Sequence, residues 1–138
     1  MSHAIDPDLK IAQDIAREAV ETCHLGTTTG TRHAIEIELL HEKMDEMRRI
    51  EIKSPTHSLG WILEIATLAK EFECGNCVEL ACIAFMRAVE QKQFPVELFQ
   101  DPRTDHYFVV LKREISGADE ELQPKTDLTA LGSAIICV

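Results

Sequence analysis

One cysteine and one histidine in this sequence stand where they could act together on a carbonyl group. Cys77 lies in the run ECGNCVELA at residues 73–81, which leads into an apolar helical pattern, and His106 begins the apolar segment HYFVVL. A thiolate can attack an amide carbonyl, and a neighbouring imidazole can take the thiol proton and later deliver it to the leaving amine. The pair therefore predicts cysteine-dependent acyl transfer, provided that the fold brings Cys77 and His106 together.

The position predicted for Cys77 would favour its reactive form. A free cysteine thiol is mostly protonated at neutral pH, and the thiolate is the nucleophile. The N-terminus of a helix carries roughly half a positive charge, which stabilises an anion there, and an imidazolium at His106 would act in the same way. The backbone amide of Cys77, which has no acceptor in the first helical turn, could donate to the oxyanion formed on the attacked carbonyl. This chemistry needs no cofactor.

Asn76 and Glu79 mark the start of the helix that would carry the thiol. Asn is a good N-cap, and an acidic residue three positions later completes a capping box in which each side chain bonds a free backbone amide. Cys77 is then the first helical residue. The following residues form an apolar stripe that we expect to be buried: Val78, Ala81, Cys82, Phe85, Ala88 and Val89.

The remaining patterns divide the chain into a helical half and a half that contains strands. Helices are predicted from Pro7 or Asp8 to about Gly26, from Arg32 to Arg49, and from Ser58 to Phe72. Strands are predicted at 95–99, 106–112 and 134–138, with a charged loop at 117–126. The second strand is apolar on both faces, which is typical of a central strand. We expect an α+β fold in which the buried helix packs on a small antiparallel sheet.

The segment CGNCVELA at residues 74–81 resembles the nucleophile segment of the papain-like superfamily, and most closely its bacterial toxin and effector branches. Those branches include proteases, glutamine deamidases and transglutaminase-like proteins, and their order of helix, strand and strand is similar to that of residues 72–138. The resemblance implies Cys77 as the nucleophile and His106 as the base. The third member would be Asp or Asn just beyond Val138, with Asp127 as a fallback that precedes the strand.

The resemblance also implies a substrate and an architecture. The substrate would be a protein attacked at a main-chain amide or a Gln side chain, and the context would be a bacterial effector acting inside a host cell. The single domain expected for 1–138 would comprise a helical N-terminal part, 1–57, and a papain-like core, 58–138, that is incomplete at its C-terminus. Neither a cofactor nor a metal is implied. One departure is that Glu71 and Glu73, which are acceptors when ionised, stand where papain-like enzymes have a Gln donor.

Composition limits the partners and the compartment. The chain has 24 acidic and 14 basic residues and a net charge of -10, which argues against nucleic acid and anionic lipid as partners. Five cysteines in a chain long enough for a core predict reduced thiols rather than a disulfide framework. Because we see no signal peptide or membrane-spanning run, we expect a cytoplasmic protein or an effector exported without such a signal. The bare apolar strand at the end predicts a truncated chain.

Other interpretations of the same residues stay open. A noncatalytic interaction domain of the same fold would keep Cys77 as an inert thiol. Cys74 and Cys77 have the spacing of a dithiol redox motif, although a strand rather than a helix is expected before such a site. The same pair could hold a metal only with two further ligands, such as His106 and Cys137. Ordinary capping, core or exposed positions are expected for His24, His33, His41, His57, Trp61 and Phe85.

Overall fold

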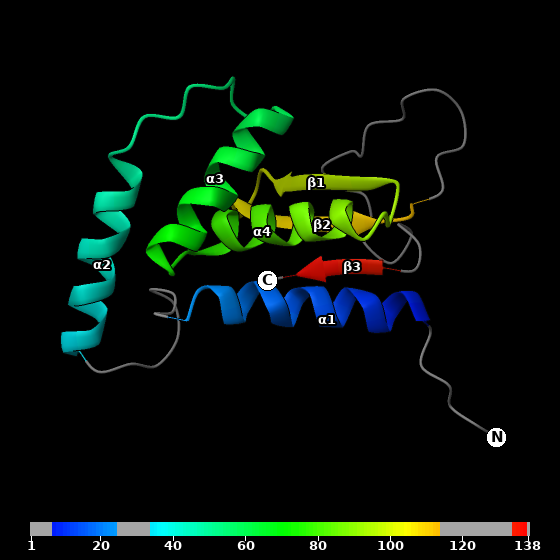
Figure 1. The fold of residues 1–138 in the computed structure, drawn as a ribbon, viewed down its shortest axis with the longest axis horizontal. Coiled ribbons are helices and arrows are strands. Elements are labelled where there is room, and N and C mark those ends of the chain that lie inside the picture. Colours follow the sequence, from blue (N-terminus) through cyan, green and yellow to red (C-terminus); the bar gives the residue numbers. More distant parts are fainter. Residues whose placement is uncertain (1–6, 25–33, 114–133, 138) are drawn as a thin grey trace.

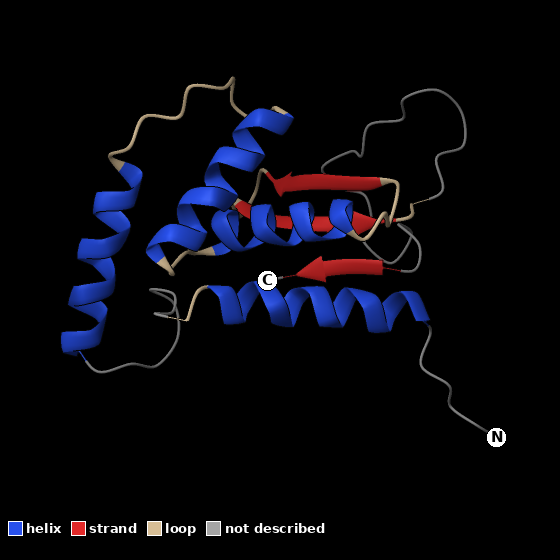
Figure 2. Cartoon of the chain, viewed as in Figure 1, coloured by secondary structure: helices blue, strands red, loops and turns tan. Residues whose placement is uncertain are grey.

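In the part of the chain that the structure describes, four helices and three strands form an α+β fold, as the sequence predicts (Figure 1). The computed structural model describes residues 7–24, 34–113 and 134–137. The elements in chain order are α1 (Pro7–Thr22), α2 (Ala34–Arg48), α3 (Leu59–Phe72), α4 (Cys77–Glu90), β1 (Val96–Asp101), β2 (His106–Leu111) and β3 (Ala134–Cys137). The helices precede the strands in the chain (Figure 2).

The three strands form one antiparallel sheet in the order β1-β2-β3. Val109 in β2 pairs with Leu98 of β1 on one side and with Ile136 of β3 on the other. The last four residues of β2 are buried. The prediction that residues 106–112 form a central strand is therefore confirmed, because its apolar residues are covered on both faces.

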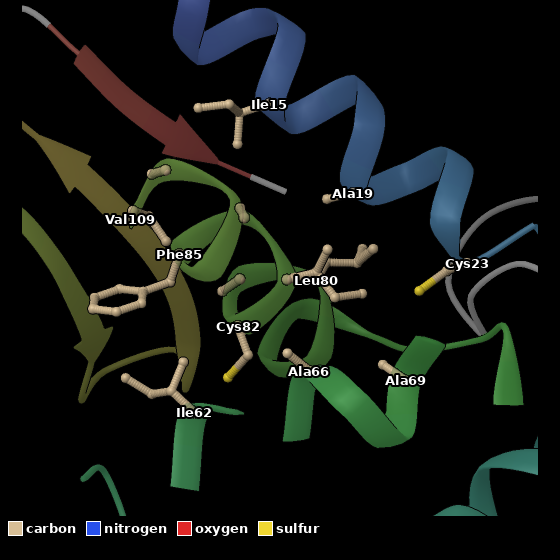
Figure 3. Packing of buried hydrophobic residues seen from close by; sticks show 14 of the residues in the cluster. Ile15, Ala19, Cys23, Ile62, Ala66, Ala69, Leu80, Cys82, Phe85 and Val109 are labelled. Atoms are coloured by element: carbon tan, nitrogen blue, oxygen red, sulfur yellow. The ribbon is translucent and has the colours of Figure 1, made fainter. Parts of the chain in front are cut away.

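Helix α4 lies at the centre of the molecule, between α1, α3 and the sheet (Figure 3). Several of its side chains are small and fully buried, among them Ala81, Cys82 and Ala84. Small side chains allow neighbouring elements to approach the helix backbone closely. The predicted apolar stripe is thus confirmed as the core face, and burial extends almost around the helix from Glu79 to Phe85.

The two faces of β2 contact different groups of residues. Tyr107, Val109 and Leu111 pack in the main core, which includes the buried residues of α4. Phe108 and Val110 pack with Phe99 of β1 in a second, smaller cluster. This is the alternation that a strand requires, since successive side chains point to opposite faces.

The helix ends follow local sequence. Ser58 caps α3 by accepting a hydrogen bond from the Trp61 amide at 3.2 Å, and α3 ends at Glu73, which has a left-handed backbone with φ of 57°. The helix predicted to about Gly26 is slightly too long, since α1 ends at Thr22, and α2 ends at Arg48, one residue before the predicted end. The predicted start of the second helix, at residue 32, lies outside the described residues. The predicted loop at 117–126 and Val138 lie outside the described residues.

Within the described parts of the chain, no helix is long and apolar enough to cross a membrane.

Candidate active site around Cys77

The turn between α3 and α4 presents Cys77 as the first residue of α4, as predicted. Glu79 Oε1 accepts a hydrogen bond from the Asn76 amide at 2.8 Å, and the reciprocal bond of the capping box is also present. Gly75 permits this turn, because a Cβ atom there would stand only 2.4 Å from the Cβ of Glu79. The local sequence therefore fixes the position of the thiol at the helix start.

Glu79 has a second partner that its local sequence does not indicate. Its side chain is about 4% exposed, and Oε1 accepts a hydrogen bond from Nη2 of Arg48 at 2.9 Å. Arg48 is the last residue of α2. A buried acidic residue calls for a cationic partner, but Arg48 and Arg49 are adjacent in the chain and only the fold selects between them.

Cys77 differs from the other described thiols in accessibility. It is half-buried, whereas Cys23, Cys74 and Cys82 are buried. Burial, followed by the negative charge of Glu79, raises the pKa of Cys82 to about 12. Burial, followed by charge on Cys74 and then Glu79, raises the pKa of Cys23 to about 12. The pKa of Cys74 is also raised, first by burial and then by Glu79.

The burial of Cys82 was predicted, and Figure 3 shows its sulfur among the core residues beside Ala66 and Ile62. Cys74 was predicted as a partner of Cys77, either in a dithiol motif or in a metal site with two further ligands. Its full burial leaves only one sulfur of the pair open to an external thiol or disulfide. The side chain of Cys137 is not among the described ones.

The structure brings Cys77 to the start of β2. Its Sγ donates to the backbone oxygen of Asp105 over 4.0 Å, and Asp105 directly precedes His106. His106 is half-buried, and its backbone pairs in register with Asp101 of β1. The two residues singled out by the sequence therefore lie at the same end of the sheet.

The position of the His106 backbone does not by itself determine the face of the sheet on which its side chain lies. Strand alternation puts His106 on the face of Phe108, whereas Tyr107 lies on the α4 face. However, His106 is the terminal strand residue and follows Asp105, whose φ is 54°, and alternation is least strict at such an end. The described hydrogen bond of the thiol is to Asp105, so a bond between Cys77 and His106 stays a prediction.

A cluster of three rings, His57, Trp61 and Tyr107, lies beside this site. Nε2 of His57 and the hydroxyl of Tyr107 are 3.0 Å apart. The rings of His57 and Trp61 meet edge to face at 5.1 Å, and those of Trp61 and Tyr107 are 6.4 Å apart. His57 was predicted to be a capping or exposed residue, and the cluster was not predicted, because His57 and Tyr107 are 50 residues apart in the chain.

The surroundings of Tyr107 connect the ring cluster with the thiol. The pKa of Tyr107 is raised, first by burial and then by negative charge on Cys82, Cys77 and Asp105. These groups act on the phenol only because they lie close to it. The ring cluster, the turn at Asp105 and the thiol thus form one local environment.

Other predicted candidates take ordinary roles. Glu73 is bonded to His24, with 2.7 Å between Oε2 and Nε2, and Glu71 is exposed. His41 and Asp45 are exposed on α2, as expected for a solvated face. Asp127 and His33 lie outside the described residues. Among the residues that are described, no group of three or more His, Cys, Asp or Glu could hold a metal ion.

Comparisons with known proteins return no match: no family model, no curated protein and no solved structure resembles the chain significantly.

Proposed function

We propose that this protein is a cysteine-dependent acyl-transfer enzyme of papain-like or transglutaminase-like type, acting on a protein substrate. Cys77 is the nucleophile and His106 is the base. The observation that carries the proposal is the position of Cys77: a half-buried thiol at a capped helix start, with its sulfur against the carbonyl that precedes His106. The other described thiols are buried and hold their protons.

The proposed reaction uses groups of this chain only. The thiol proton passes to the imidazole of His106, and sulfur bonds to the carbonyl carbon of the substrate. The amide of Cys77 donates to the oxyanion. The C–N bond then breaks, and the imidazolium returns the proton to the leaving amine. Water or another amine attacks the thioester and frees the thiol.

Charge around the nucleophile is compatible with this chemistry. The carboxylate of Glu79 lies two residues from Cys77, where an uncompensated negative charge would oppose formation of a thiolate. Arg48 neutralises that carboxylate at 2.9 Å, so the positive end of the α4 dipole is left to act on the sulfur.

The third member of the site stays a prediction of the resemblance. β3 runs antiparallel to β2, and Cys137 pairs with Phe108 near the His106 end of β2. An Asp or Asn directly after this strand, where the resemblance predicts it, would therefore arrive beside His106. Such a residue could orient the imidazole toward Cys77.

Rate-limited alkylation tests the proposal. Limiting iodoacetamide at pH 6, followed by peptide mass spectrometry, should label Cys77 well before the other thiols. His106→Ala should slow that labelling at least about ten-fold, since an imidazolium stabilises the thiolate. His41→Ala, which alters an exposed histidine on α2, is the matched control. Equal labelling of Cys77 in wild type and His106→Ala would contradict the assigned pair.

A noncatalytic interaction domain of the same fold is the second candidate. It is favoured by strand alternation, which puts His106 on the face of Phe108, and by the exposed Ile35 and Leu39 of α2. Under this alternative, no variant at His106 changes the alkylation of Cys77.

The acyl-transfer proposal also includes a biological context. The protein would be a bacterial effector delivered into a host cell, or an enzyme of the cytoplasm.

A further inference from the structure

We propose that the ring cluster of His57, Trp61 and Tyr107 is the wall of a substrate subsite beside Cys77, and that it takes a cationic side chain, Arg or Lys, next to the attacked amide. This inference rests on the proposed function and names the chemistry of its substrate.

The cluster joins two distant parts of the chain, the start of α3 and β2. His57 comes from the segment before α3, Trp61 from the first turn of α3, and Tyr107 from β2. His57 has a φ of 67°, a left-handed backbone conformation that is unfavourable for a non-glycine residue. The bond of its ring to the Tyr107 hydroxyl and the edge contact with Trp61 hold it there.

The rings are not sealed in the core. His57 is exposed, and Trp61 and Tyr107 are half-buried against the core. Aromatic rings that are only partly covered offer a face or an edge to a ligand, and a cation over such a face is attracted by the π electrons. The cluster therefore has both the support and the accessibility of a binding wall.

Charge selects the cationic occupant. Asp105, whose charge acts on Tyr107 and whose backbone contacts Cys77, is exposed and bonded through Oδ1 to Gln100 at 3.5 Å. On the same turn, the guanidinium of Arg103 is paired with Asp101. The chain as a whole carries a net charge of -10. A cationic side chain beside Tyr107 and Asp105 would meet complementary charge, whereas an acidic one would be repelled.

Alkylating probes with one reactive head and different tails test the subsite. The tails on an iodoacetamide group are quaternary ammonium, neutral amide, benzyl and carboxylate, and the rate of Cys77 modification is measured for each at low salt. The cationic probe should react about two- to five-fold faster than the neutral one, the range expected for a cation over partly exposed rings. The carboxylate probe should react more slowly, and salt should reduce both differences.

Variants connect the preference with the rings. His57→Ala and Trp61→Ala should bring the ratio of cationic to neutral rates close to one, and Asp105→Asn should lower it. Leu63→Ala is the matched control, because Leu63 is 50% exposed on α3 and lies half a turn away from Trp61 around the helix. If Trp61→Ala fails to fold, His57→Ala still tests the wall, since His57 is exposed.

Each result decides one claim. A wild-type protein without a cationic preference overturns the inference, and so does faster reaction with the benzyl probe, which would make the wall apolar. A preference that survives loss of His57 and Trp61 would come from net charge alone and would also overturn it. Failure of the proposed function is seen separately, as unchanged iodoacetamide reactivity in His106→Ala, while the ratio between probes still reports on the wall.

Discussion

Helix α4 carries two cysteines five residues apart, one partly accessible to solvent and the other in the core. Cys77 stands at the helix start, half-buried and against the turn at Asp105. Cys82 is fully buried, and burial raises its pKa to about 12. The start of the helix therefore determines which of these two thiols is accessible to a reagent. The capping box and Gly75 bring one thiol out of the core that encloses the other.

The largest expected effect is the difference in alkylation between these two thiols. With a pKa of about 12, Cys82 should react on the order of a thousand-fold more slowly than an ordinary thiol, because only the thiolate attacks. Among the four thiols that the structure describes, Cys77→Ser should therefore remove nearly all fast labelling. Mass spectrometry of iodoacetamide-treated protein, with and without urea, measures this. Rapid labelling of Cys82 without urea would contradict the expected difference between the two thiols.

Alkaline pH should weaken the core that holds the buried thiols. Because their folded-state pKa is raised above the unfolded value, the unfolded chain loses these protons first as pH rises. The stability they contribute is complete below about pH 8.5 and is lost toward pH 12, at up to about 1.4 kcal/mol per pH unit for each thiol.

Urea unfolding at pH 8 and pH 10 measures this loss. Cys82→Ala should lower the stability at pH 8 but reduce its decline between the two pH values. Cys77→Ala serves as the control at the accessible position. An unchanged slope in Cys82→Ala would show that other groups cause the decline.

Removing Arg48 should affect the helix start more than the core. Arg48→Ala leaves the carboxylate of Glu79 buried without its cation, and we expect a loss of about 2 kcal/mol, discounted because Arg48 is itself half exposed. Urea unfolding gives the loss, and Arg49→Ala, at an exposed neighbouring position, is the control. If both variants lose the same free energy, the bond to Glu79 has no special role.

The smallest expected effect concerns the cap of α3. Ser58→Ala removes the acceptor for the Trp61 amide, which should cost about 1 kcal/mol. A thermal melt measures it, with Thr56→Ala at an exposed position as control. Because Trp61 belongs to the ring cluster, this variant should also disturb the preference of Cys77 for the cationic probe. An unaffected preference would separate the helix cap from the cluster.

The parts of this fold that local sequence specifies were predictable. The start of α4 follows from Asn76 and Glu79, and the central place of β2 follows from apolar residues at successive positions. The strand bounds differ from the expected ones by only one or two residues, because turn residues at both ends define them.

The contacts that complete the site were not predictable, because they join distant segments. The choice of Arg48 as the partner of Glu79 depends on how α2 lies against α4. The bond between His57 and Tyr107 spans the whole of α3, α4 and β1. The face on which the His106 side chain lies was also not predictable. It is inferred from alternation with Tyr107 and Phe108, and only packing shows which of these two residues contacts α4.

The alanines of α4 have one more consequence. Because Ala81, Ala84 and Ala88 are completely buried, the helix backbone is wedged among α1, α3 and the sheet, and it could tilt only if several neighbours moved together. The sulfur of Cys77 is therefore expected to keep its position relative to the core. Any accommodation of differently shaped ligands would fall to side chains near it outside α4, His57 next to Tyr107 and Asp105 in the turn before β2.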